Sequence, residues 1–512
     1  MPTSNPPSGP TIRGEGIVID RDERRAIVVR TAGDLAASRN GTIDTDAEAG
    51  LIDEITNLVE TLVGVLGRFD GKYLQLPEQI LTTVMRKHQR YLPIRDADGH
   101  LLPLFVTFAN GACDSNAVRD GNENVLRARF EDATFFWNAD LHTTPQQFRS
   151  QLTALTFENR LGSMADRANR IATASRDLAT RITLSPNDSS TLQRAGELVK
   201  FDLATQMVIE MTSLAGTMAR EYARKAGESD AVTDALLDTE LPRHHHDRLP
   251  ATTPGAILAL ADRYDLLVAM LAIGAKLTGT SDPYGLRRAA LGVIRILPES
   301  PQLETLTYRD GLTTAADKLR AQGITVDDAV LDTAEDLLAT RYEQRLRDEN
   351  VPIALIEAIR PGSENPRRAD RLRIDIEHAR NTAPQELAEI VEGLQRIARI
   401  VPPGTPATIE TETLTEPAER NLITALSRLA DSQEQRLTAW AVTAQPLAAA
   451  LRTFFDEILV MSDAPATRAA RLSLLATVLH SAPFEIDWKA LHHLRSDTFD
   501  DIATDAVVVE SV

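Results

Sequence analysis

Residues 74–111 read LQLPEQILTTVMRKHQRYLPIRDADGHLLPLFVTFANG and carry clear signals for both a helix and a hairpin. Pro77 is typical of the first turn of a helix, and Pro93 disfavours helical backbone in the residue before it. Asp98-Gly99 favours a tight turn, and the apolar run LFVTF that follows favours a strand. The stretch therefore predicts a helix followed by a β-hairpin, the clearest β element of the chain.

The end of this predicted helix is basic and aromatic. Lys87, Arg90 and Arg95 are able to contact phosphates, and His88 and Tyr91 are able to stack or to donate hydrogen bonds. The alternative interpretation is a helix end whose cations complement the helix dipole. On residue chemistry alone this second interpretation is favoured.

A second helix is expected over residues 120–140, DGNENVLRARFEDATFFWNAD. It places Arg127 and Arg129 on an amphipathic surface. Upstream, apolar residues at helical spacing predict a helix over residues 47–65. Cationic and aromatic groups are therefore concentrated in a short part of the chain.

Overall composition limits the function classes. The chain has 512 residues, so two to four domains are expected. Aromatic residues make up 4% of it, which favours aliphatic helix packing over an all-β sandwich. The net charge of −19 argues against indiscriminate binding to nucleic acid, since a polyanion repels an acidic protein. Binding to nucleic acid would then require local basic patches.

Cys113 is the single cysteine, which excludes an intrachain disulfide and a cysteine-based zinc site. A reducing cytoplasm fits this usage. The first sixteen residues have no apolar core, so they are not read as a signal peptide. No run of about 18 apolar residues occurs, so no membrane span is expected.

The pattern along the chain predicts a mainly α, multidomain protein with a small α+β region near its start. The helix at residues 254–274 is apolar nearly all round and is expected to be buried at the centre of a helical domain. The expected divisions are a disordered segment 1–16, a partial α+β domain 17–143, a helical domain 144–300, a helical connector 301–400, a helical domain 401–500 and an acidic tail 501–512.

No complete catalytic centre is visible. The sequence has no GxxxxGK[ST] loop, no GxGxxG after a strand, no HExxH and no GxSxG. The run His244-His245-His246-Asp247 is flanked by prolines and is interpreted as a solvated loop, because adjacent histidines do not converge on one ion. His246-Asp247 is similar to the pair of metal-dependent phosphohydrolases, but the other ligands of that site are missing. No metal is expected.

Charged residues on the buried helix need partners. Asp262 and Asp265 lie on it, and Arg287 and Arg288 follow on the next predicted helix. Because buried charges must pair, these four residues are predicted to form a structural ion-pair network.

The C-terminal segment 448–479, AAALRTFFDEILVMSDAPATRAARLSLLATVL, predicts a helical hairpin. Arg468 and Arg471 lie three residues apart on its second helix, and Arg452 lies on its first. Alone, this is a helical hairpin with a basic edge and nothing more specific.

The order of several long motifs is informative. The segments at 74–111 and 120–140 are followed by LTFENRLGSMADRANRI (155–171), KFDLATQMVIEMTSLAGTMAREYA (200–223), PGAILALADRYDLLVAMLAIG (254–274), SDPYGLRRAALGVIRIL (281–297) and FFDEILVMSDAPATRAARLSLLATV (454–478). Together they resemble, in family order over roughly residues 17–490, the beta subunit of bacterial tetrameric glycyl-tRNA synthetase. The last segment is similar to the family's anticodon-binding module, and 144–300 looks like its degenerate His-Asp domain.

The resemblance implies a division of labour within an alpha2-beta2 assembly. In this family the alpha subunit makes glycyl-adenylate from glycine and ATP with magnesium, and the beta subunit captures glycine tRNA. This chain would then be a ligase subunit that binds no cofactor, carries no catalytic residue and does not activate glycine alone. A cytoplasmic location is implied, with neither DNA nor membrane as a partner.

The resemblance also implies where tRNA is contacted. Arg452, Arg468 and Arg471 are the candidates for the anticodon end. The candidates for the acceptor side are Lys87, His88, Arg90, Tyr91, Arg127 and Arg129.

Two departures from the family pattern leave an alternative. The usual beta subunit has a further amino-terminal region of the order of 200 residues, which this sequence lacks. The triple histidine replaces a FAG-like loop of the family. The alternative function is therefore a truncated beta-like protein that binds tRNA without supporting ligation.

Overall fold

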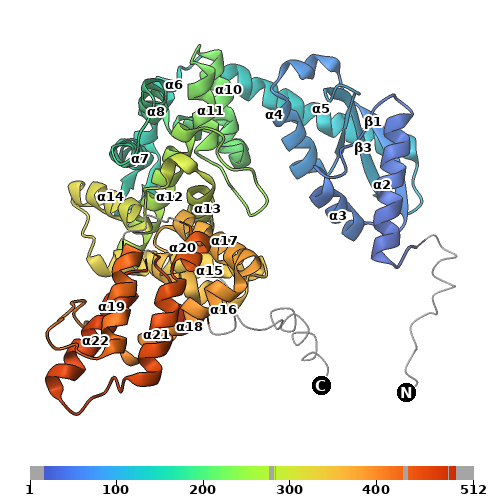
Figure 1. The fold of residues 1–512 in the computed structure, drawn as a ribbon. Coiled ribbons are helices and arrows are strands. Elements are labelled where there is room, and N and C mark those ends of the chain that lie inside the picture. Colours follow the sequence, from blue (N-terminus) through green and yellow to red (C-terminus); the bar gives the residue numbers. More distant parts are fainter. Residues whose placement is uncertain (1–16, 276–281, 283, 431–435, 483, 492–512) are drawn as a thin grey trace, which may run out of the picture. The chain divides into compact units, whose positions relative to one another are not determined.

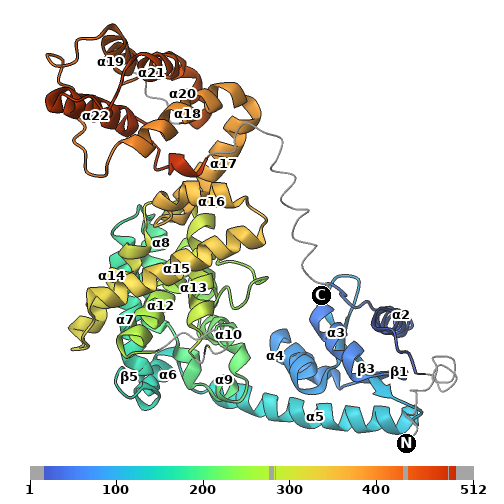
Figure 2. The same ribbon diagram turned by 90° about the horizontal axis from the view of Figure 1, so that it is seen from below.

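The computed structural model describes residues 17–275, 282, 284–430, 436–482 and 484–491. The chain divides into two compact units (Figures 1 and 2). Unit 1 comprises Met1–Asn169 and Glu197–Glu240, and unit 2 comprises Arg170–Gly196 and Leu241–Val512. Helices dominate both units, which confirms the predicted mainly α class. The finer domain boundaries stay predictions.

Unit 1 contains a three-stranded antiparallel sheet. Its strands β1 (Leu62–Arg68), β2 (Leu92–Arg95) and β3 (Leu101–Asn110) lie in the order β1-β3-β2. The β2–β3 pair is the predicted hairpin, and its turn contains Gly99 at φ +85°, a backbone conformation that glycine adopts without strain. The hairpin prediction is confirmed.

The helix predicted over residues 47–65 ends earlier than expected. Helix α3 spans Ala49–Leu58, and residues 62–65 belong to strand β1. The prediction was wrong there because the partner strand β3 lies far along the chain. Gly67 permits the close pairing, since a Cβ at this position would lie 2.3 Å from the Phe105 ring.

Helices cover both faces of the sheet. Helix α2 (Arg21–Ala37) packs with α3 on one face, where Val28, Ile52 and Val106 share a buried cluster. Helix α5 (Ser115–Asp140) contacts β1. Its Phe130 meets Phe69 edge to face at 5.1 Å between ring centroids. The side chains of successive strand residues alternate between these two layers.

The predicted helix after Pro77 is confirmed, with a change of winding. It begins as α4 (Glu78–Thr83) and continues as the π-helical segment η2 (Val84–Gln89). Arg90 ends it in the left-handed conformation at φ 56°, with its N–H bonded to the carbonyl of Met85. This wide last turn carries the basic residues.

The rest of unit 1 and the helices that lead into unit 2 form short elements separated by breaks. The elements are α6 (Pro145–Gln151), β4 (Thr156–Glu158), β5 (Gly162–Ser163), α7 (Met164–Ala179), α8 (Pro186–Leu198), η4 (Phe201–Ala204), α9 (Gln206–Glu210), α10 (Thr217–Lys225) and α11 (Asp230–Asp238). Asp140 stabilises one break, because its carboxylate accepts hydrogen bonds from the N–H groups of Gln206 and Met207.

Helix α12 (Thr253–Ala272) lies at the centre of unit 2 and is buried along nearly its whole length, as predicted. It packs against α13 (Leu286–Glu299), α14 (Tyr308–Ala321) and α15 (Asp328–Asp348). No described helix is both long and apolar enough to span a membrane. The remaining helices are α16 (Ile353–Ile359), α17 (Pro366–Thr382), α18 (Pro384–Ile400), α19 (Pro417–Ala430), α20 (Leu437–Thr443), α21 (Gln445–Glu457) and α22 (Pro465–His480).

Candidate nucleic-acid interface

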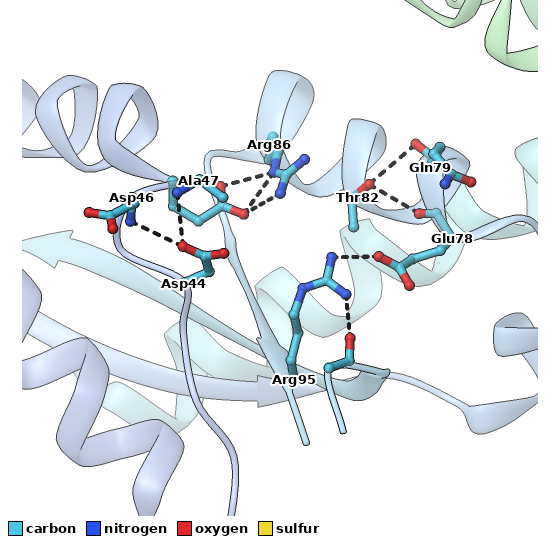
Figure 3. A network of polar contacts seen from close by, with 10 residues as sticks. Asp44, Asp46, Ala47, Glu78, Gln79, Thr82, Arg86 and Arg95 are labelled. Atoms are coloured by element: carbon cyan, nitrogen blue, oxygen red, sulfur yellow. Dashed lines mark hydrogen bonds and ion pairs between the residues drawn. The ribbon is translucent and has the colours of Figure 1, made fainter. Parts of the chain in front are cut away.

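Two arginines beside the sheet of unit 1 form ion pairs that join neighbouring elements. Arg86 forms an ion pair with Glu48, whose side chain is 2% exposed. Arg95 pairs with Glu78 and donates to the carbonyl of Gly99 (Figure 3). Each cation therefore joins helix α4–η2 or strand β2 to another element, which is a structural role.

The neighbouring cations are more accessible. Arg90 forms an ion pair of 2.6 Å with Glu54, and both side chains are 47% exposed. Lys87 is exposed and makes neither a hydrogen bond nor an ion pair with any residue that the structure describes. The predicted contact through the side chain of His88 lies outside the described residues. Lys87 is thus the most available cation of this helix end.

Tyr91 belongs to the core. Its ring is 2% exposed and stacks on Phe105, with 4.5 Å between the ring centroids. Its hydroxyl donates to the Asn122 side chain at 2.6 Å, and burial raises the pKa of Tyr91 to about 12. The ring is therefore not available to stack on a nucleobase in this conformation, although the sequence placed it among the tRNA contacts.

The outer face of α5 presents the two predicted arginines. Arg127 is exposed and donates to Asn124 one turn earlier. Arg129 is exposed and has no hydrogen-bond or ion-pair partner among the described residues. Helix α5 packs against η2, so these arginines and Lys87 belong to neighbouring elements.

The three arginines of the C-terminal hairpin differ from one another. Arg471 is largely buried, pairs at 2.7 Å with Glu419 and donates to the carbonyl of Leu459. Arg468 is partly buried, and its guanidinium lies 3.5 Å from the carbonyl of Ser462. Arg452 is 62% exposed and lies 3.4 Å from Glu389. Arg471 fixes the hairpin, whereas Arg452 has most of its surface in solvent.

The buried helix α12 has an ion pair that the sequence did not reveal. Asp265 pairs with Arg170 at 2.6 Å, and both side chains are at most 5% exposed. Arg170 also donates to Gln322. Arg170 shares a helix face with buried Ala174, and that spacing is the signal that would have indicated its burial.

The structure also locates the other three members of the predicted network. Asp262 is 9% exposed on α12. The backbone N–H of Arg287 donates to the Asp282 carboxylate at 2.9 Å, near the start of α13. Arg288 is exposed, and its guanidinium bonds to no residue that the structure describes. Arg288 therefore lies on the surface and is not part of an ion-pair network with the residues that the structure describes.

Two sets of carboxylates in the described part of unit 1 bond to backbone N–H groups of the fold. Asp202 is buried and accepts the N–H of Gly216 at 2.6 Å. Burial, followed by the charge of nearby Glu240, raises the pKa of Asp202 to about 6. At the hairpin turn Asp96, Asp98 and His100 lie close enough to share an ion, yet Asp96 already accepts two N–H groups of this same turn.

Comparison with known proteins identifies the relatives of this chain. Residues 10–360 match the family described as "Glycyl-tRNA synthetase beta subunit". The chain is 33% identical to the glycine–tRNA ligase beta subunit of Shouchella clausii and to that of Synechocystis, covering 94% of this chain and 70% of each relative. It is 34% identical to the chloroplastic/mitochondrial glycine–tRNA ligase 2 of Arabidopsis thaliana, covering 93% of this chain and 44% of that protein.

Proposed function

Since the chain belongs to the glycyl-tRNA synthetase beta-subunit family, we propose that it is the beta-type subunit of a glycine–tRNA ligase. It holds glycine tRNA while an alpha subunit activates glycine with ATP. The observation that carries this proposal is the family match over residues 10–360, supported by about one-third identity across 94% of the chain.

The proposed role in the reaction is positioning. Interactions with remote parts of the tRNA lower the entropic cost of bringing its terminal ribose hydroxyl to the adenylate on the partner. The acceptor-side contacts are proposed for Lys87, Arg90, Arg127 and Arg129, because their side chains reach solvent. The anticodon-side contacts are proposed for Arg452 and Arg468.

Aminoacylation tests the proposal directly. Glycine tRNA is incubated with glycine and ATP, and charging is followed with this chain alone, with an alpha subunit alone and with the mixture. Charging in the mixture only is the expected result. Tight tRNA binding without charging in the mixture would support the alternative, a tRNA-binding protein without ligase activity, and would overturn the ligase assignment.

The contact residues are tested by salt dependence. The double variant Lys87→Ala, Arg129→Ala is expected to weaken tRNA binding and to lower the slope of log affinity against log salt by about 1–2, since each lost phosphate contact removes about 0.7–0.9 from it. Arg39→Ala is the matched control, because Arg39 is exposed near the end of α2 and is not among the predicted contacts. An unchanged slope in the double variant would exclude these two residues as phosphate contacts.

A further inference from the structure

Two adjoining cavities in unit 2 are lined mainly by arginines. Their volumes are about 570 Å³ and 250 Å³, and both walls include His245 and Arg345. We call the pair the arginine cavity. It lies among helices α13, α15 and α17 and the loop at residues 243–250. The arginines that line it are Arg287, Arg288, Arg295, Arg341, Arg345, Arg367, Arg371 and Arg373. The carboxylates that line it are Glu299, Asp348, Glu349 and Asp370.

The smaller chamber has the stronger excess of positive charge. Four arginines and one carboxylate, Asp348, line it, in a chain whose net charge is −19. Asp348 accepts a hydrogen bond from the amide of Gln344. Neither Arg288 nor Arg341 bonds to any residue that the structure describes. Their charges are therefore not neutralised by neighbouring carboxylates.

In the larger chamber the arginines are oriented by the protein. Arg345 pairs with Asp370 at 2.7 Å and donates to the carbonyl of Ile294. Arg371 pairs with Glu304 at 2.8 Å, and Arg373 with Glu377 at 3.1 Å. These bonds leave several guanidinium N–H groups of the chamber without an acceptor while fixing the side chains that carry them.

Some of the arginines that line the cavity have buried N–H donors. The Nε atoms of Arg341 and Arg373 are shielded from solvent and donate no hydrogen bond within the described part of the chain. Those of Arg345 and Arg367 are also shielded and donate no hydrogen bond there, but they lie 3.3 Å and 3.9 Å from the carboxylates of Glu349 and Glu304. A buried donor without an acceptor costs about 1–3 kcal/mol, so an orphan donor calls for an explanation. An anion with several oxygens is the acceptor that such a cluster of guanidinium groups recognises best.

The triple-histidine loop is fixed against the arginine cavity. Arg295 on α13 donates to the carbonyls of His244 and Asp247, at 3.0 and 2.9 Å. The Asp247 carboxylate in turn accepts the backbone N–H of Arg243. The tethered loop places His245 in the walls of both chambers. His245, on the exposed loop that the sequence predicted, therefore borders a cationic cavity.

We propose that the arginine cavity binds phosphate groups, with Arg288 and Arg341 as the direct contacts, Arg345 held beside them by Asp370, and His245 at the edge of the cavity. The phosphates come either from the backbone of the bound RNA, which rests on the proposed function, or from a free nucleoside polyphosphate. The chamber that Arg288 and Arg341 line measures about 250 Å³. The adjoining larger chamber, at about 570 Å³, falls in the range of about 300–1,000 Å³ that small-molecule sites occupy.

Charge removal tests the arginine cavity. The variants are Arg288→Gln, Arg341→Gln and their combination. The control is Arg347→Gln, because Arg347 is also on α15, does not line the cavity and lies 4.0 Å from Glu343. Each protein is titrated calorimetrically with inorganic pyrophosphate and with ATP, and its affinity for glycine tRNA is measured separately. If the combined variant misfolds, the single variant Arg288→Gln still tests the proposal, because Arg288 is exposed.

We expect the combined variant to lose affinity about tenfold or more for the phosphate source that the cavity uses, since a hydrogen bond to a charged group contributes about 1.5–3 kcal/mol. The control is expected to change by less than about twofold. A loss confined to tRNA identifies the RNA backbone, and a loss confined to pyrophosphate or ATP identifies a free nucleotide. Unchanged affinity for all three probes would overturn the proposal. The pyrophosphate and ATP arms do not depend on tRNA, so failure of the ligase assignment is recognised separately by the absence of charging in the mixture.

Discussion

The arginines beside the sheet of unit 1 and two arginines of the arginine cavity, Arg288 and Arg341, differ in what neutralises them. Arg86, Arg90 and Arg95 each face one carboxylate from another element. Arg288 and Arg341 face none among the described residues. The expectations were different, because the resemblance placed Arg90 among the tRNA contacts and the sequence placed Arg288 in a structural network. A high local density of cations is therefore not by itself evidence of a binding site, because a neighbouring carboxylate that neutralises an arginine and fixes its side chain gives that arginine a structural role as well.

The largest expected effect comes from breaking the Arg86–Glu48 pair. Arg86→Met leaves the Glu48 carboxylate buried without its cation, and we expect the free energy of unfolding to fall by about 3 kcal/mol. Urea unfolding at neutral pH measures it. Lys87→Met is the control on the next residue and is expected to change stability by less than about 0.5 kcal/mol. Equal effects of the two substitutions would contradict the distinction between paired and available cations.

The buried carboxylate of Asp202 should make the stability of the folded protein depend on pH. Burial raises the pKa of Asp202 from 3.8 to about 6, so ionisation of Asp202 destabilises the folded state. Its contribution to stability is fully present below pH about 4 and is lost as the pH rises through about 6. Asp202→Asn removes this dependence. Between pH 4.5 and 7.5 the wild type should lose about 2 kcal/mol more stability than the variant.

Urea unfolding of both proteins at the two pH values measures this difference. A pH-independent gap between the wild type and Asp202→Asn would show that the carboxyl does not titrate differently in the folded and unfolded chains.

A substitution of Tyr91 tests the region beside the sheet of unit 1, with a smaller expected change in stability. Tyr91→Phe keeps the stacking on Phe105 but leaves the Asn122 side chain without its donor. We expect a loss of about 1 kcal/mol in unfolding free energy. The tRNA affinity should not change, because the ring is buried. A clear loss of tRNA affinity with unchanged stability would restore Tyr91 as a binding residue.

The smallest expected change in stability comes from removing an arginine that has no carboxylate partner among the described residues. Arg341→Gln removes a cation that bonds to no described residue, so we expect the unfolding free energy to change by less than about 0.5 kcal/mol. The same substitution should weaken phosphate binding. Destabilisation by more than about 1.5 kcal/mol would assign Arg341 a structural role and remove it from the arginine cavity's binding groups.

Local signals predicted much of the fold. The hairpin at residues 92–110 follows from Asp98-Gly99 and the apolar run after it, and helix α12 follows from its continuous apolar surface. Strand β1 was missed because its hydrogen-bond partner is β3, 36–48 residues away along the chain, and its apolar positions at helical spacing fit a helix equally well. The short helix at residues 206–210 also depends on a distant contact, since the Asp140 carboxylate accepts hydrogen bonds from the backbone N–H groups of residues 206 and 207.

The sequence by itself determined the helical class, the hairpin and, through motifs in a fixed order, the resemblance to the family that comparison then showed. Only the tertiary structure decided which charges are neutralised. Glu48 reaches Arg86 from 38 residues away, and Asp265 reaches Arg170 from 95 residues away. The physical reason is that helices and turns are formed by neighbours within a few residues, whereas an ion pair or a cavity depends on side chains that meet only after the elements have packed.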